Sequence, residues 1–172
     1  MNILYAPWRE AYVTNSKKSD NDSCSGCVFC QILLAKDSAD HHFILKVTSQ
    51  AFVVLNLYPY NAGHLLIVPR EHVATLEDLT PATRAHIMEL MTTSTVILKN
   101  KIQAQGINAG LNLGSASGAG IPAHLHLHVI PRWQGDTNFI TTIGATKNIS
   151  VDLQKMYETL LPEFQALSVE SI

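Results

Sequence analysis

Apolar and polar residues follow one another along the chain in a pattern that predicts short strands separated by turns. Apolar runs bounded by turn residues predict five strands, over 43–47, 51–57, 64–68, 107–113 and 124–130. Pro59, Asn61 and Gly63 lie between the second and third runs and are typical turn residues. The first three strands are therefore expected to follow each other closely in the sheet.

One stretch has the periodicity of a long helix. Thr80-Pro81 combines an N-cap residue with a proline that suits the first helical turn. Apolar residues then recur at helical spacing from Ile87 to Ile102, and the helix is expected to end near Gly106. Its apolar stripe must cover a sheet, because the rest of the chain offers little else to bury it.

A second helix is predicted near the end of the chain, with Ser150 as its cap and Pro162 as its stop. The resulting order, three strands, a helix, two strands and a helix, predicts an α+β fold with a mostly antiparallel sheet. The polar stretch 14–26 is expected to be a loop, so residues 1–26 form an N-terminal arm and loop, and 27–172 a single domain.

Composition narrows the choice of function. Charged residues make up only 15% of the 172 residues and the net charge is −2, so a field that would hold nucleic acid is absent. No apolar run approaches the ~18–20 residues of a membrane span, and the first residues lack the layout of a secretion signal. We expect a cytoplasmic protein with no membrane partner, in which 8 histidines stand out against 12 lysines and arginines.

Three of these histidines, His124, His126 and His128, alternate with apolar residues in the last predicted strand. Alternate side chains of a strand share a face, so the three rings point one way and the apolar side chains between them point into a core. Imidazoles in a row are poor packing material, because each ring has a donor and an acceptor to satisfy. The pattern favours a functional site over ordinary core or surface histidines.

Two functions compete for these rings. A single metal ion could take several of them, but residues four apart in a strand lie ~13 Å apart, which resists binding of all three to one ion. Alternatively, the central ring, His126, acts as a nucleophile toward phosphorus while its neighbours position the phosphate and move protons. The small, glycine-rich loop 114–120 just before the histidines favours the second function, because backbone N–H groups in such loops can bind anions.

The segment His124-Leu-His126-Leu-His128-Val-Ile resembles the signature of the histidine triad superfamily of nucleotide hydrolases and transferases. Segments 56–69, 110–114 and 132–140 also match, the last two resembling the branch with diadenosine tetraphosphate phosphorylases. The resemblance implies a HIT-like fold, in which His126 attacks the α-phosphorus and forms a nucleotidyl-histidine. His128 and His64 would then hydrogen-bond the phosphate or fix the tautomer of His126.

The same resemblance implies the residues that bind substrate. Asn56 would hold the ribose hydroxyls, and Val54 and Leu66 would flank the purine. The phosphates would lie against a set of small or polar residues: Asn112, Gly118, Ala119 and Gly120. Many relatives carry Gln or Ser where this chain has Gly120, so a side-chain hydrogen bond is missing at that place.

A structural zinc ion is the implied cofactor. Cys27-Val-Phe-Cys30 is similar to the cysteine pair of the zinc-bearing members, with His72 and His124 as the other two ligands. A Cys₂His₂ set is closed and tetrahedral, so this zinc would tie the N-terminal segment to the histidine strand. Cys24 could substitute in the set or stay outside it, and a redox dithiol is the rival interpretation of the cysteines.

The sequence thus predicts an enzyme that cleaves dinucleoside polyphosphates of the diadenosine tetraphosphate type, with inorganic phosphate or water completing the reaction. A nucleoside phosphoramidase and a non-catalytic nucleotide sensor are the alternatives. The resemblance also implies a homodimer. Of the remaining residues, His41, His42 and His86 are expected to be solvated, and Trp133 to pack in the core.

Overall fold

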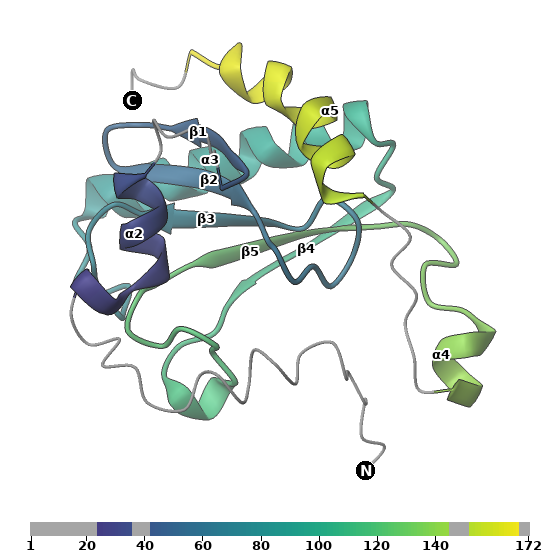
Figure 1. Cartoon of the computed structure of the whole chain (residues 1–172), viewed down its shortest axis with the longest axis horizontal. Helices are drawn as coiled ribbons and strands as arrows, with labels where there is room; N and C mark the ends of the chain where they lie inside the picture. Colours follow the sequence, from purple (N-terminus) through teal and green to yellow (C-terminus); the bar gives the residue numbers. More distant parts are fainter. Residues whose placement is uncertain (1–23, 36–41, 145–151, 169–172) are drawn as a thin grey trace.

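The computed structural model describes residues 24–35, 42–144 and 152–168, which fold around one antiparallel sheet (Figure 1). Its elements are a 3₁₀ turn η2 (Cys24–Gly26), α2 (Val28–Leu34), β1 (Ile44–Val47), β2 (Ala51–Leu55), β3 (Leu65–Pro69), α3 (Pro81–Lys101), β4 (Gly106–Leu111), a 3₁₀ turn η3 (Ser115–Ser117), β5 (Leu127–Arg132), α4 (Phe139–Gly144) and α5 (Leu153–Gln165). The expected α+β class and antiparallel sheet are confirmed.

The five strands lie in the order β1-β2-β3-β5-β4, and every neighbouring pair is antiparallel. Insertion of β5 between β3 and β4 brings two distant segments together, with His128 opposite Leu66 on one side and Gly110 on the other. The histidine-bearing strand is therefore an inner strand, held on both sides by backbone hydrogen bonds.

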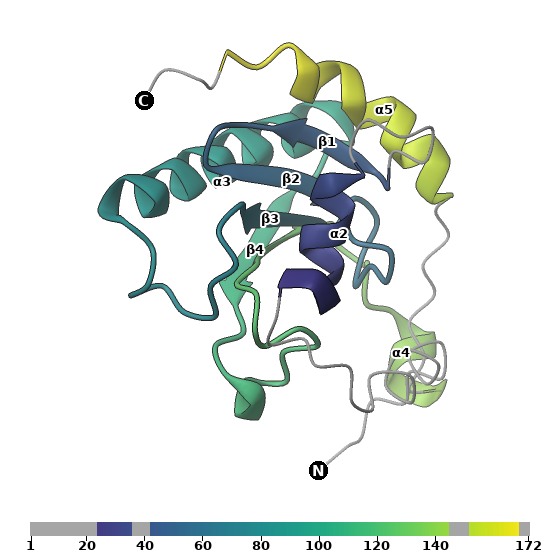
Figure 2. The same cartoon turned by 60° about the vertical axis from the view of Figure 1, so that its left-hand side comes forward.

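Alternate residues of the strands enter two separate cores on opposite faces of the sheet. Toward α3 and α5 point Val53 and Leu55 of β2, together with Leu127 and Val129 of β5. Toward α2 point Phe52 and Val54 of β2 and their counterparts in β3. Figures 1 and 2 show α2 on one face and α3 on the other, with α5 running along the β1 side. The triad histidines fall on the α2 face because Leu125, Leu127 and Val129 occupy the other.

The long helix begins as its sequence predicts. The Thr80 hydroxyl accepts a hydrogen bond from the backbone N–H of Thr83, and Pro81 occupies the first turn. The helix ends at Lys101 instead of near Gly106, because Gln103 takes a left-handed conformation with φ of 55°. Ile87, Leu90 and other apolar residues at helical spacing bury against the sheet.

The C-terminal helix differs from its prediction at both ends. Ser150 lies outside the described residues, and the side chain of Asp152 caps the helix by accepting from the N–H groups of Gln154 and Lys155. Pro162 does not end the helix, which continues to Gln165. The cost of one missing N–H near the last turn is offset by Phe164, which is fully buried beyond it.

The remaining differences concern one strand, two short helices and the N-terminal arm. The strand expected over 124–130 begins only at Leu127, since Leu125 N–H donates to the carbonyl of Val73 and so leaves the ladder. Helices α2 and α4 had no counterpart in the prediction. Residues 1–23 of the expected N-terminal arm lie outside the described residues. Among the described helices, none has the length and apolarity needed to cross a membrane.

Candidate active site and metal site

A pocket of about 800 Å³, which includes space open to solvent, lies on the α2 face of the sheet. It is bounded by α2, the end of β2 with the turn that follows, and the 112–121 loop. The residues that line it are Val28, Phe29, Ile32, His42, Val54, Leu55, Asn56, Leu57, Tyr58, Tyr60, Leu66, Asn112, Gly118, Gly120, Ile121, His126 and His128. Apolar side chains, imidazoles, an amide and glycine backbone thus line the same pocket, with the Phe29 ring 5.2 Å from that of His126.

The three triad histidines share a face but have three different environments. The ring of His124 lies against the thiols of Cys27 and Cys30, His126 lines the pocket, and His128 pairs with His64. Of the three, His124 alone belongs to the group of described residues that can hold a metal ion. The structure therefore does not bring the whole triad to one ion.

His126 has the protonation state of a nucleophile. Its Nδ1 lies 2.9 Å from the carbonyl oxygen of His124, and a carbonyl can only accept, so the proton is on Nδ1. Nε2 is left with a lone pair. The ring is 7% exposed, and this burial lowers its pKa, while the bond to the carbonyl opposes the shift. A neutral imidazole with a free Nε2 lone pair can attack an electrophilic phosphorus without a separate base.

His64 and His128 form a hydrogen-bonded pair of neutral rings. The backbone N–H of Tyr60 donates to His64 Nδ1 at 3.1 Å, so the proton of His64 is on Nε2. That Nε2 lies 2.9 Å from His128 Nδ1, which must accept. His128 therefore carries its own proton on Nε2 and can donate it. Burial above all, then the neighbouring imidazoles, lowers the pKa of His64 to about 3, so His64 is uncharged at pH 7.

The expected substrate residues lie around the pocket with one exception. Asn56, Val54, Leu66 and Asn112 all line it. The side-chain oxygen of Asn56 accepts from the N–H of Tyr58 at 2.9 Å and its Nδ2 lies 3.3 Å from His64 Nδ1, which orients the amide.

The glycine-rich loop connects β4 to the triad through η3. Gly118 ends the 3₁₀ turn in a left-handed conformation, with φ of 84°, where a side chain would be strained. Gly118 and Gly120 line the pocket, whereas Ala119 is not among the lining residues. The backbone N–H groups of this loop can donate hydrogen bonds to a phosphate in the pocket.

A second polar cluster consists of two cysteines and two histidines. Sγ of Cys27 and Cys30 and a ring nitrogen each of His72 and His124 all lie within 4.8 Å of one another. The closest pairs are Cys27 Sγ to His124 Nδ1 at 3.2 Å and Cys30 Sγ to His72 Nδ1 at 3.4 Å. The four predicted ligands are therefore together, and the group can hold a metal ion; Cys24 is exposed and not one of the four, although its thiol lies beside that of Cys30.

Two observations fit this group to a tetrahedral ion. Zinc bonds of ~2.0–2.3 Å require ligand atoms about 3.3–3.8 Å apart, close to the shortest distances found here. In addition, His124 Nε2 lies 2.9 Å from the Pro69 carbonyl and must donate to it, so Nδ1 presents its lone pair to the thiols. A backbone carbonyl behind a ligating histidine is the usual arrangement at metal sites. Burial lowers the pKa of His124 to about 4, which keeps that lone pair available at pH 7.

Some residues differ from their sequence-based interpretation. His42 lines the pocket and is half-buried, so it is not a solvated loop residue. His86 of α3 is 3% exposed and hydrogen-bonds the hydroxyl of Thr48 at 2.8 Å, so it is a buried residue and not a solvated one. Trp133 packs against the α3-side core, as expected. His41 lies outside the described residues.

Sequence reasoning also missed two contributors to the site. Phe29 of α2 lines the pocket, and its ring centroid lies 5.2 Å from that of His126. Tyr60 supplies the backbone N–H that fixes the His64 tautomer, a role that no side-chain pattern reveals. The apolar, aromatic composition of 28–33 was the available sign that this segment covers something.

Three alternate histidines that lead into an inner strand, beside a glycine-rich loop and a pocket, define the class of histidine triad proteins. The HIT domain model matches residues 38–135, more than half of the chain. The chain belongs to the HIT domain family.

Particular relatives agree with this assignment. AP-4-A phosphorylase of Mycobacterium tuberculosis is 38% identical over 164 residues, 94% of this chain and 83% of that protein. The asymmetrical bis(5'-nucleosyl)-tetraphosphatase of Schizosaccharomyces pombe is 34% identical over 88 residues, 51% of this chain and 47% of that protein. The crystal structure of a Zn-bound histidine triad family protein from Mycobacterium smegmatis has a TM-score of 0.68 at 24% identity, covering 83% of this chain and 96% of that one, a likeness of fold.

Proposed function

We propose that this protein cleaves dinucleoside polyphosphates, diadenosine tetraphosphate among them, by phosphorolysis through a covalent nucleotidyl-His126. The observation that carries the proposal is the tautomer of His126, whose Nδ1–H is held by the His124 carbonyl so that Nε2 is the nucleophile. The 38% identity to an AP-4-A phosphorylase over 94% of the chain supports the substrate class and the use of phosphate.

The reaction has two steps. In the first, the Nε2 lone pair of His126 forms a bond to the α-phosphorus, and the phosphoanhydride bond to the leaving nucleotide breaks. His128, which holds a proton on Nε2, stabilises the charge that develops on the phosphoryl oxygens. In the second step an oxygen of inorganic phosphate attacks the same phosphorus, the phosphorus–nitrogen bond breaks, and the His126 lone pair is restored.

The pocket suits this substrate. Its apolar side chains, among them Phe29, Val54 and Leu66, suit the face of a purine, and Asn56 offers an amide to ribose hydroxyls. The phosphates would then lie toward Asn112 and the glycine loop, next to His126. Because imidazoles and backbone N–H groups bind the anion, the low lysine and arginine content is no obstacle.

Hydrolysis is the second candidate, favoured by the 34% identity to a tetraphosphatase over 51% of the chain. The two are separated by their products from diadenosine tetraphosphate, measured by chromatography with and without phosphate. ADP plus ATP, formed only when phosphate is present, supports phosphorolysis. AMP plus ATP supports hydrolysis, and bound nucleotide without turnover supports a sensor and contradicts both.

The Cys27, Cys30, His72 and His124 group would hold a structural zinc ion. The protein fills all four coordination positions of the ion. The ion would therefore cross-link the α2 segment to the segments that carry His72 and His124, and it would take no part in the chemistry. Elemental analysis should find close to one zinc per chain, lost in Cys30→Ala and retained in His86→Asn, which changes a buried histidine outside the group. A stable native protein without metal would contradict the assignment.

We further propose a homodimer joined through sheet edges. β4 pairs only with β5 among the described strands, and Asn108, Ala109 and Gly110 on it are exposed. Sedimentation equilibrium should give twice the mass of the chain, and a monomer at micromolar concentration would contradict this proposal.

A further inference from the structure

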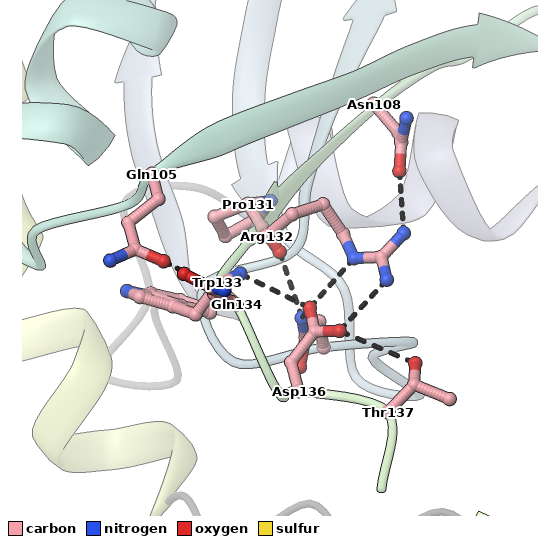
Figure 3. A network of polar contacts seen from close by, with 9 residues as sticks. Gln105, Asn108, Pro131, Arg132, Trp133, Gln134, Asp136 and Thr137 are labelled. Carbon is pink, nitrogen blue, oxygen red and sulfur yellow. Dashed lines mark hydrogen bonds and ion pairs between the residues drawn. The ribbon is translucent and has the colours of Figure 1, made fainter.

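A dense polar network surrounds the carboxylate of Asp136, just after β5 (Figure 3). Arg132 donates to it through two nitrogens, at 2.7 and 2.8 Å, in a bidentate ion pair. Trp133 N–H donates at 3.2 Å, the Thr137 hydroxyl at 3.3 Å, and the Asn61 amide at 2.7 Å. Five donors therefore converge on one side chain that is 9% exposed.

The carboxylate is ionised throughout the physiological range. The hydrogen bonds from Arg132, more than any other contact, hold the pKa of Asp136 well below its usual range, against the opposing effect of burial. The Arg132 side chain is 40% exposed and also donates to the Asn108 side chain at 2.8 Å. The ion pair is thus anchored on two sides, and its charge does not change as the enzyme works.

One donor, Asn61, comes from a distant part of the chain. Its amide nitrogen donates both to Asp136 and, at 2.9 Å, to the carbonyl of Pro131 in β5. Its backbone carbonyl in turn accepts from the N–H of His64 at 3.2 Å. Asn61 is 7% exposed, so water cannot replace these partners freely.

The turn between Asn61 and His64 is also fixed by packing. Gly63 has φ of 71°, and a Cβ there would lie 2.8 Å from Ile102 Cδ1 and 3.5 Å from Pro131 Cγ. This turn therefore sits tightly on the junction of β5 and the segment after α3. It has little freedom to shift without breaking the Asn61 contacts.

This turn delivers the nearer of the two donors to His64 Nδ1, the backbone N–H of Tyr60 at 3.1 Å, while the amide of Asn56 lies at 3.3 Å. The N–H of Tyr60 reaches His64 Nδ1 only while the turn keeps its shape, and the tautomer of His64 dictates that of His128. A chain of contacts thus leads from Asp136 through Asn61 and the turn to a ring in the pocket. Of its members, only Tyr60 and His128 line the pocket.

We propose that Asp136 is a positioning residue which, through Asn61, holds the Tyr60–His64 turn so that His64 and His128 each keep their proton on Nε2. The effect on turnover rests on the function proposed above, whereas the effect on the tautomers does not. The rival interpretation is a clamp that stabilises the end of β5 and has no influence on the rings.

The decisive variant is Asp136→Asn in the metal-containing protein. Asparagine keeps the shape but loses the charge, so the bonds from Arg132 and Asn61 weaken. Long-range proton–nitrogen correlation spectra of ¹⁵N-histidine protein report which nitrogen of each ring is protonated. We expect single Nε2–H forms of His64 and His128 in the parent, and a mixture in the variant. With diadenosine tetraphosphate, kcat should fall about 10–100-fold while AMP affinity, measured by calorimetry, changes less than about 2-fold.

Two control variants and a second test complete the design. Asn108→Ala removes the other partner of Arg132, and Glu163→Gln breaks an ion pair with Lys101 elsewhere; both should leave tautomers and kcat as in the parent. Asn61→Ala, which keeps the Arg132–Asp136 pair, should reproduce the tautomer mixture even if Asp136→Asn fails to fold.

The proposal is overturned if either folded variant, Asp136→Asn or Asn61→Ala, keeps the parent tautomers, whatever happens to its thermal stability. It is also overturned if the tautomers change but kcat does not. If the parent protein cleaves no dinucleotide, the proposed function fails, yet the spectra still decide whether Asp136 sets the protonation of the two rings.

Discussion

The two faces of the sheet are made by the same strands but closed to different degrees. Over one face lie the 21-residue helix α3 and the 13-residue α5, and alternate strand residues there bury a continuous apolar core. Of the helices in the described part of the chain, the seven-residue α2 lies over the other face, where it covers a smaller core and leaves the pocket open. The triad histidines lie on the less covered face. A buried polar group there can hydrogen-bond a ring, a carbonyl or a substrate.

This comparison predicts that changes on the open face alter activity and that changes on the closed face alter stability. The largest effect is expected from His126→Ala. Turnover of diadenosine tetraphosphate should fall by about 10⁴-fold or more, because the nucleophile is lost, while AMP binding is retained. Initial rates and calorimetry measure the two quantities. Full activity in this variant would disprove the assignment of the nucleophile.

On the closed face, Leu90→Ala should have the opposite profile. Leu90 is fully buried between α3 and the sheet, so its truncation should lower the free energy of unfolding by about 2–5 kcal/mol. Urea titration measures this loss, and the rate per folded molecule should equal that of the parent. A selective loss of kcat in this folded variant would break the division between the faces.

Both faces hold buried histidines whose pKa is lowered by burial, and one from each face, His64 and His86, predicts the dependence of stability on pH. Burial lowers the pKa of His64 to about 3 and also lowers that of His86, whereas both titrate near 6.5 when unfolded. Below pH 6.5 these histidines bind protons in the unfolded chain but not in the folded protein. The free energy of unfolding therefore decreases as the pH falls toward 3. The loss is at most about 1.4 kcal/mol per pH unit for each group.

Single variants separate these two histidines. His64→Asn and His86→Asn should each flatten the fall of unfolding free energy between pH 6.5 and 5, measured by urea titration at several pH values. Only His64→Asn should also reduce kcat, because His86 bonds Thr48 on the closed face. An unchanged slope in both variants would refute the neutral, buried state of these rings.

The smallest effect is expected from Glu163→Gln, which breaks the ion pair between α5 and Lys101 of α3. The two side chains are 38% and 43% exposed, so solvent screens the 2.7 Å contact. The loss should be below about 1 kcal/mol in thermal or urea unfolding and should vanish in 1 M salt. A larger loss that persists in salt would mean that the closed face depends on charge as well as on packing.

Local periodicity explains which features were predictable from sequence. Alternation over 124–130 placed His126 on one face and Leu127 on the other, and this holds because the period of an extended chain is local. The cap at Thr80 was likewise readable from two adjacent residues. The grouping of His72 with Cys27 and Cys30, in contrast, came from family resemblance and not from periodicity.

The missed features depend on contacts between distant segments or on backbone atoms. His86 is buried because Thr48, 38 residues earlier, lies beside it, and no pattern within the helix reveals that partner. The strand starts at Leu127 because Leu125 bonds Val73 outside the sheet. The tautomer of His64 depends on a backbone N–H, which every residue except proline possesses and which therefore carries no sequence signature.

His124 points two of its groups in different directions. Its ring faces the thiols, while its carbonyl holds the Nδ1 proton of His126. A molecule in which the ring has left the thiols, through chelation or oxidation of the cysteines, would also release the carbonyl from its place beside His126. Purified samples with incomplete metal content would then contain competent and incompetent molecules side by side. The value of kcat should accordingly be calculated from the concentration of active sites found in a burst titration. Total protein concentration would exceed that of active sites and give a kcat that is too low.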